Sequence, residues 1–155
     1  MIIILLGASG VGKRAVKEEL IRRYDFEEII PYTTEICRDV RTQDRDCRSM
    51  EANQFATLVN AGVLAEYDDY PRGYLSGTLR SDYLGGNKVA VLTPASLRQL
   101  KQNCPYGNIF TVLLTANLGT RIKRYIDDCG VDRFDFRDKD TVVSRVERDF
   151  AMFSG

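Results

Sequence analysis

The stretch "GASGVGKR", residues 7–14, decides the fold of this 155-residue chain. Its first seven residues fit the phosphate-binding pattern G-x-x-x-x-G-K-[ST]. In this pattern the glycines let backbone N–H groups close around phosphate oxygens, and the lysine reaches the β- and γ-phosphates. The eighth residue is Arg14, where the pattern has a hydroxyl that binds magnesium. The stretch therefore predicts a nucleotide site with an altered metal position.

The residues on either side of the stretch are typical of a strand and a helix. Residues 2–6 form a continuous apolar run, as in a strand buried on both faces. Val16, Leu20 and Tyr24 recur every four residues, so we expect a helix to begin near Lys13. The helix N-terminus adds partial positive charge to the site. The residues that we assign to ATP binding are Gly7, Ala8, Ser9, Gly10, Val11, Gly12, Lys13 and Arg14.

The rest of the chain continues the alternation of strand and helix. The runs at 88–93 and 109–116 are expected to be buried strands, and Thr93 followed by Pro94 is typical of a helix start. Helices are also expected over 118–128 and from residue 142, with a mobile loop at 129–138. This order predicts an α/β fold with a mainly parallel sheet flanked by helices.

The middle of the chain differs from this pattern. Residues 34–49 are polar and charged, a short helix is expected around Phe55, and residues 63–78 are rich in Tyr and turn residues. We expect this part to be an insertion that forms one wall of a cleft.

Composition excludes several classes of chemistry. Basic and acidic residues both number 22, so net charge predicts neither a nucleic-acid partner nor a membrane surface. The chain has no His, which excludes Ser-His-Asp and Cys-His catalysis and imidazole-bound metal. The four cysteines form no C-x-x-C pair and "MIIILL" is too short for a signal peptide, so we expect free thiols and a cytoplasmic location.

The chain resembles the guanylate kinase family from residue 2 to about residue 150. The loop matches the family pattern G-x-S-G-x-G-K-[ST] up to Arg14. "YTTEICR" (32–38) resembles the family segment that contacts guanosine monophosphate (GMP), and "GVLAEY" (62–67) resembles its guanine-reading segment. The resemblance implies a phosphate-loop core at 1–33 and 81–155, a nucleoside-monophosphate-binding insertion at about 34–80, and a lid at about 121–138.

The resemblance also implies a set of functional residues. Glu66 falls on the carboxylate that reads guanine, and Thr78 falls on the hydroxyl facing this base. Arg38 and Tyr74 are expected near the substrate phosphate. The residues implied to act on the transferring phosphoryl group are Lys13, Arg124, Arg133 and Arg145. No protein ligand for a metal is implied, so Mg²⁺ would be held mainly by the nucleotide phosphates.

Other family positions are substituted, which leaves two functions open. The substituted positions carry Arg14, Glu35, Cys47, Ser76 and Thr93. The first function is an ATP-dependent kinase that converts GMP or deoxy-GMP to the diphosphate, with Lys13 as its strongest support. The alternative is a guanylate-kinase-like module that binds a nucleotide or a protein partner with little or no turnover.

Overall fold

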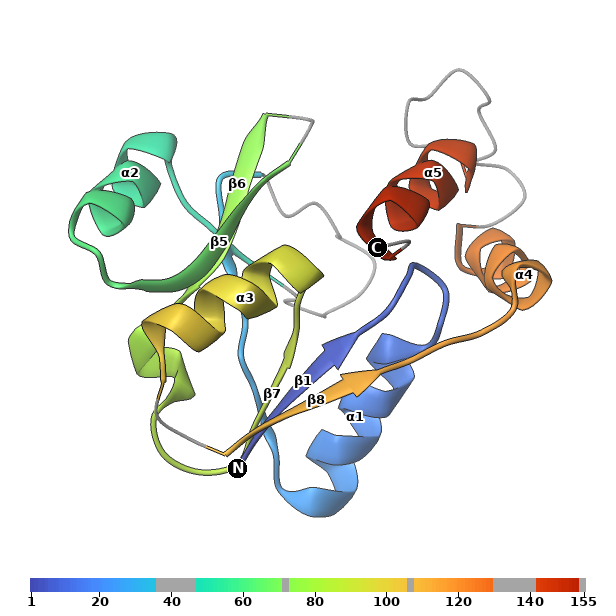
Figure 1. Cartoon of the computed structure of the whole chain (residues 1–155), viewed down its shortest axis with the longest axis horizontal. Helices are drawn as coiled ribbons and strands as arrows, with labels where there is room; N and C mark the ends of the chain where they lie inside the picture. Colours follow the sequence, from blue (N-terminus) through green and yellow to red (C-terminus); the bar gives the residue numbers. More distant parts are fainter. Residues whose placement is uncertain (36–46, 71–72, 106–107, 130–141, 154–155) are drawn as a thin grey trace.

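The computed structural model contains two sheets and five α-helices in the part of the chain that it describes, residues 1–35, 47–70, 73–105, 108–129 and 142–153 (Figure 1). The first sheet has the order β2-β7-β1-β8, and all its pairs are parallel. Its strands are β1 (Ile2–Leu6), β2 (Glu27–Glu28), β7 (Lys88–Val91) and β8 (Ile109–Leu113). The predicted α/β class with a parallel sheet flanked by helices is confirmed.

Helices α1 (Lys13–Tyr24) and α3 (Pro94–Asn103) cover opposite faces of this sheet. Successive side chains of a strand point to opposite faces. Ile4 of β1 accordingly packs in a cluster with Leu100 of α3, whereas Leu5 packs in another with Val16 of α1. The apolar run at 2–6 is continuous because both faces of β1 are buried.

Two predicted strands are shorter than the sequence indicated. β8 ends at Leu113, which pairs with Leu6, because β1 itself ends there and turns into the glycine-rich loop. β7 ends at Val91, and Thr93 then caps α3 by accepting a hydrogen bond from the Ser96 N–H. The predicted start of α3 at Thr93 and Pro94 is confirmed.

The second sheet stands beside the first and has the order β4-β3-β6-β5. Its main part is an antiparallel hairpin of β5 (Leu64–Tyr70) and β6 (Tyr74–Leu79). The Gln99 and Asn103 side chains of α3 donate hydrogen bonds to carbonyls of β5 and so join the two sheets. The remaining elements are β3 (Tyr32–Thr33), β4 (Arg48–Ser49), α2 (Ala52–Asn60) and the 3₁₀ helix η1 (Arg80–Tyr83).

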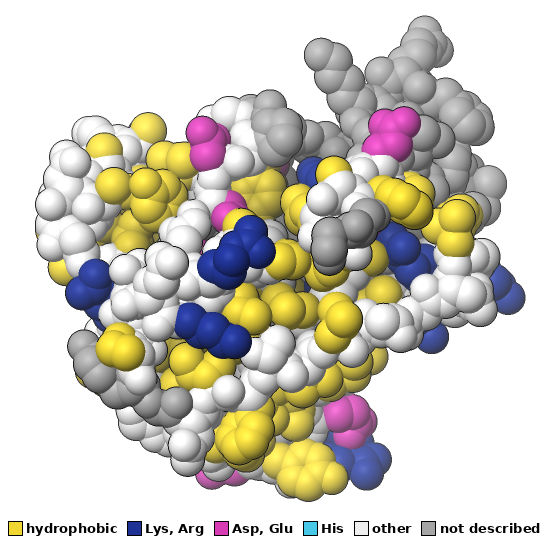
Figure 2. Space-filling view, in the orientation of Figure 1, with side chains coloured by type: hydrophobic (Ala, Val, Ile, Leu, Met, Phe, Trp, Pro, Cys, Tyr) yellow, Lys and Arg dark blue, Asp and Glu magenta, His cyan; other side chains and the backbone are white. Residues whose placement is uncertain are grey.

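Helices α4 (Leu118–Cys129) and α5 (Val142–Phe153) lie at the tip of the glycine-rich loop (Figure 1). Apart from the backbone of Cys129, the loop predicted at 129–138 lies outside the described residues. None of the described helices is long and apolar enough to cross a membrane. Apolar side chains are exposed on the β8 edge, and Figure 2 shows such side chains across the lower part of this view.

Candidate active site

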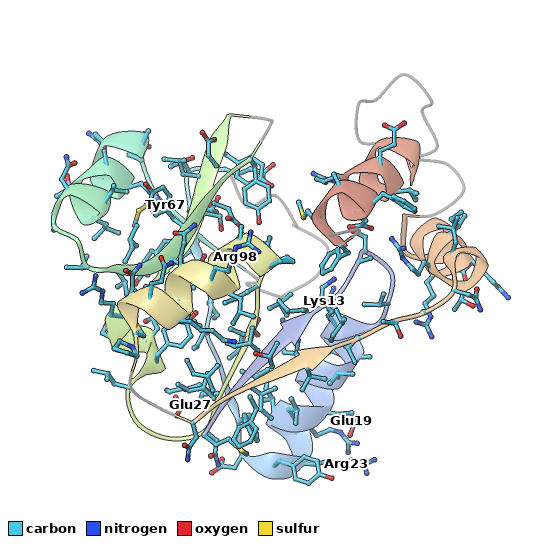
Figure 3. All side chains as sticks on the ribbon, viewed as in Figure 1. Lys13, Glu19, Arg23, Glu27, Tyr67 and Arg98 are labelled. Atoms are coloured by element: carbon cyan, nitrogen blue, oxygen red, sulfur yellow. The ribbon has the colours of Figure 1, made fainter. Side chains whose placement is uncertain are left out.

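The carboxyl ends of the parallel strands open into a cavity of about 380 Å³. The glycine-rich loop forms one side, the β5–β6 hairpin forms another, and α5 lies across from α3. Lys13 lies between α3 and α5 (Figure 3), and the cavity brings it together with Glu66 of β5. Ligands of open α/β sheets bind at this end of the strands.

The loop over 7–12 is shaped by glycine. Gly7 and Gly10 both have positive φ, at 143° and 76°. A Cβ atom would lie 2.5 Å from the Leu114 carbonyl oxygen at Gly7 and 2.7 Å from the Arg121 oxygen at Gly10. Only glycine fits such positions, and glycine is what lets a loop backbone approach a phosphate closely. The loop thus fits a bound ATP phosphate chain.

Lys13 is the first residue of α1, and its side chain is hydrogen-bonded to the loop. Its Nζ donates to the carbonyl oxygens of Gly7 at 2.6 Å and Ala8 at 3.0 Å. Burial lowers the pKa of Lys13, and the charge of Asp149 opposes this shift. The hydrogen bonds to Gly7 and Ala8 use two of the three N–H donors of the ammonium, so the third is available to a phosphate oxygen.

Asp149 of α5 is hydrogen-bonded to the loop. Its carboxylate accepts from the backbone N–H of Ser9 at 2.9 Å and from the Ser9 hydroxyl at 3.3 Å. Arg121 of α4 pairs with the same carboxylate and donates to the Ser9 carbonyl oxygen at 2.8 Å. Neither residue is predicted from the sequence, because nothing in their spacing connects them to a loop more than a hundred residues away.

Arg124, predicted to contact the phosphoryl group, also lies on the loop. Its Nη1 donates to the carbonyl oxygens of Gly10 at 3.2 Å and Val11 at 3.1 Å. Arg133 lies outside the described residues, and α5 includes Arg145, whose side chain is not described. Of the predicted phosphoryl-group residues in the described part, Lys13 and Arg124 therefore come together at the loop.

Arg14 points along the solvent-exposed side of α1. Its Nε donates to the Glu18 carboxylate at 3.0 Å, and half of its side chain is exposed. The i,i+4 spacing makes this pair a helix-surface contact. Arg14 therefore does not supply a charge inside the cavity in this structure, and nothing at position 14 replaces the missing hydroxyl.

Glu66 and Thr78, which the resemblance assigns to the base, are hydrogen-bonded to each other. The Thr78 hydroxyl donates to Glu66 Oε1 at 2.8 Å and lies 2.9 Å from the Tyr83 hydroxyl. Both Glu66 and Thr78 are almost fully buried, at 3% and 1% exposure. Burial raises the pKa of Glu66, the hydrogen bond from Thr78 opposes the rise, and the nearby Asp68 charge adds to it.

A second carboxylate lies two residues further along β5. Oδ2 of Asp68 accepts from the hydroxyls of Thr93 and Ser96, both at 2.7 Å. Thr93 thus holds a carboxylate from the neighbouring sheet. Within the described residues no group of three or more acidic or cysteine side chains could hold a metal ion.

The remaining predicted residues fall on the hairpin or outside the described part. Tyr74 lines the cavity and stacks on Tyr70, with ring centroids 4.6 Å apart. Arg38 lies outside the described residues. Cys47 is disulfide-bonded and Cys104 is a buried free thiol, so the expectation of four thiols is wrong for Cys47.

The described cavity lining has more acids than bases. Two basic side chains line it, Lys13 and Arg148, against four acidic ones. The acidic side chains are Glu35, Glu66, Asp68 and Asp149. Such a lining repels the phosphates of a nucleotide unless a cation accompanies them or an acid moves away or is neutralised.

This loop and this second sheet define a phosphate-loop α/β protein with a polar pocket beside the loop. The chain matches no protein-family model. It is 26% identical to the guanylate kinase of Enterococcus faecalis over 95% of this chain and 74% of that protein. It is also 31% identical to the guanylate kinase of Lactobacillus acidophilus over 50% of this chain and 39% of that protein.

A solved structure shows the same fold. The guanylate kinase of Anaplasma phagocytophilum matches with a TM-score of 0.63 and 13% identity, over 99% of this chain and 85% of that one. The chain is thus similar to guanylate kinases in sequence and has their fold.

Proposed function

We propose that this protein transfers the γ-phosphoryl group of ATP to a nucleoside monophosphate, most favourably GMP or deoxy-GMP. One observation carries the proposal: the phosphate loop with Lys13 lines the same cavity as Glu66, which is buried and hydrogen-bonded to Thr78. Homology to guanylate kinases supports the same reaction. The cytoplasmic location remains a prediction.

The chemistry asked of the chain is positioning and charge neutralisation. The loop would hold the ATP phosphates through its N–H groups and Lys13. Magnesium carried in by ATP would neutralise the phosphates, since Arg14 lacks the hydroxyl of the loop pattern and Thr93 offers no carboxylate. Glu66 would accept from the ring N–H and amine of guanine, and Thr78 would face the base oxygen. Adenine offers neither match.

The experiment is a coupled ADP-release assay across the common nucleoside monophosphates with ATP. We expect turnover with GMP and deoxy-GMP, and at least about tenfold less with AMP, because a buried acceptor left without a donor is costly. Glu66→Gln should reduce this preference. If AMP proves as good a substrate as GMP, the base assignment is wrong.

The pH dependence offers a second check on Glu66. Burial raises the pKa of its carboxyl, and only the ionised form accepts from both guanine donors. GMP affinity should therefore fall as the pH drops through this raised pKa, and Glu66→Gln should remove the dependence. Calorimetry across pH measures both; an unchanged profile in the variant would assign the titration to another group.

One set of observations favours the alternative, a binding module with little turnover. Arg14 pairs with Glu18 on the surface, Asp149 occupies the loop, and the described lining is rich in acids. This module would bind nucleotide without forming ADP, so the same assay separates the two functions.

A further inference from the structure

We propose that Asp68 is a specificity-determining residue whose free carboxylate oxygen accepts a hydrogen bond from a sugar hydroxyl of the acceptor nucleotide. The proposal rests on the function proposed above. It starts from a carboxylate that the sequence analysis did not assign and that lines the same cavity as Glu66 and Lys13.

The geometry of β5 places Asp68 beyond the base-reading residue. Glu66 and Asp68 are two residues apart, so both point to the same face of the strand, about 7 Å apart along it. The two N–H donors of guanine are neighbours on one edge and are within reach of the single Glu66 carboxylate. Asp68 is therefore placed to meet the next part of the ligand.

The contacts of Asp68 put it on the side of the phosphate loop. Its carboxylate is hydrogen-bonded to Thr93, which follows β7. β7 pairs with β1, the strand that leads into the glycine-rich loop at Gly7. A monophosphate with its base at Glu66 and its phosphate directed toward the loop spans this position with its sugar. A carboxylate beside phosphate would be repelled, whereas a sugar is uncharged and supplies O–H donors.

Hydrogen bonds hold one oxygen of the Asp68 carboxylate in place and leave the other oxygen available as an acceptor. The hydroxyls of Thr93 and Ser96 both donate to Oδ2, so the rotamer of Asp68 is held from two directions. Oδ1 makes no hydrogen bond to the described part of the chain. A half-buried carboxylate with one fixed and one available oxygen is preorganised as an acceptor.

The test compares Asp68→Asn with wild type in calorimetric binding of GMP, inosine monophosphate and 2′,3′-dideoxy-GMP. The dideoxy ligand lacks both sugar hydroxyls, and the inosine ligand lacks the base amine. We expect the substitution to weaken the binding of GMP and of inosine monophosphate about tenfold. The affinity for dideoxy-GMP should change less than about twofold. Asp69→Asn, on the exposed face of the same strand, is the matched control and should leave all three unchanged.

The outcomes separate this inference from the function on which it rests. Equal weakening of GMP and dideoxy-GMP, or no effect of Asp68→Asn on GMP, would overturn the role of Asp68 alone. If Asp68→Asn weakens the binding of GMP but not of inosine monophosphate, Asp68 contacts the base amine, and its proposed contact with the sugar is wrong. Failure of wild type to bind GMP would overturn both. Equal melting temperatures of variant and wild type would show that the change in binding is not a loss of folding.

Discussion

Arg14 shows how one residue changes what the phosphate loop supplies. A hydroxyl at this position would face the metal, whereas the guanidinium lies on the surface with Glu18. A long side chain at the start of a helix reaches water easily, which accounts for this orientation. The ion pair is exposed, so its contribution to stability is about 0.5 kcal/mol or less.

Arg14→Ser should therefore raise kinase activity and leave the fold unchanged. The serine restores an oxygen for magnesium, and the expected gain is up to about tenfold in turnover, or roughly 1.4 kcal/mol of transition-state stabilisation. A magnesium titration of ADP formation with GMP present measures it. Lower activity in Arg14→Ser would show that the Arg14 charge is used in a state other than the one described.

At the scale of elements, the loop is held by two helices from the other end of the chain. α4 reaches the loop through Arg121 and Arg124, and α5 reaches it through Asp149. The carboxylate of Asp149 takes a backbone N–H that a phosphate loop normally offers to an anion. Nucleotide binding therefore requires α5 to release Ser9.

Asp149→Asn should strengthen ATP binding about tenfold, because the amide keeps the shape and removes a negative charge beside Lys13. Calorimetry with ATP and magnesium measures the change, and Glu147→Gln, exposed on the same helix, is the control. Weaker ATP binding in Asp149→Asn would contradict this expectation and show that the carboxylate holds the loop in the conformation that binds ATP.

Local patterns predicted the elements but not the contacts between them. Residues 2–6 and the helix start at Lys13 were predictable because burial on both faces and glycine spacing leave direct signals. Glu66 and Thr78 were assigned only through the family resemblance. Asp68 and Asp149 were missed, because their roles depend on Thr93 and Ser9, which other elements bring beside them.

For the whole molecule, the cavity lies between the second sheet and the helices at the loop tip. A kinase must exclude water from the transferring group, so the two sides should approach each other when both nucleotides bind. We expect segments 34–80 and 121–137 to gain protection from hydrogen exchange with ATP and GMP together. Unchanged protection in both segments would favour a static binding module.

The central claim is that this chain transfers phosphate from ATP to GMP. Chromatographic detection of GDP, with enzyme in excess over GMP and with ATP and magnesium, tests it most directly. We predict GDP from wild type, a rate at least about 10²-fold lower from Lys13→Ala, and unchanged folding of that variant by circular dichroism. Absence of GDP from wild type at every magnesium concentration would contradict the claim.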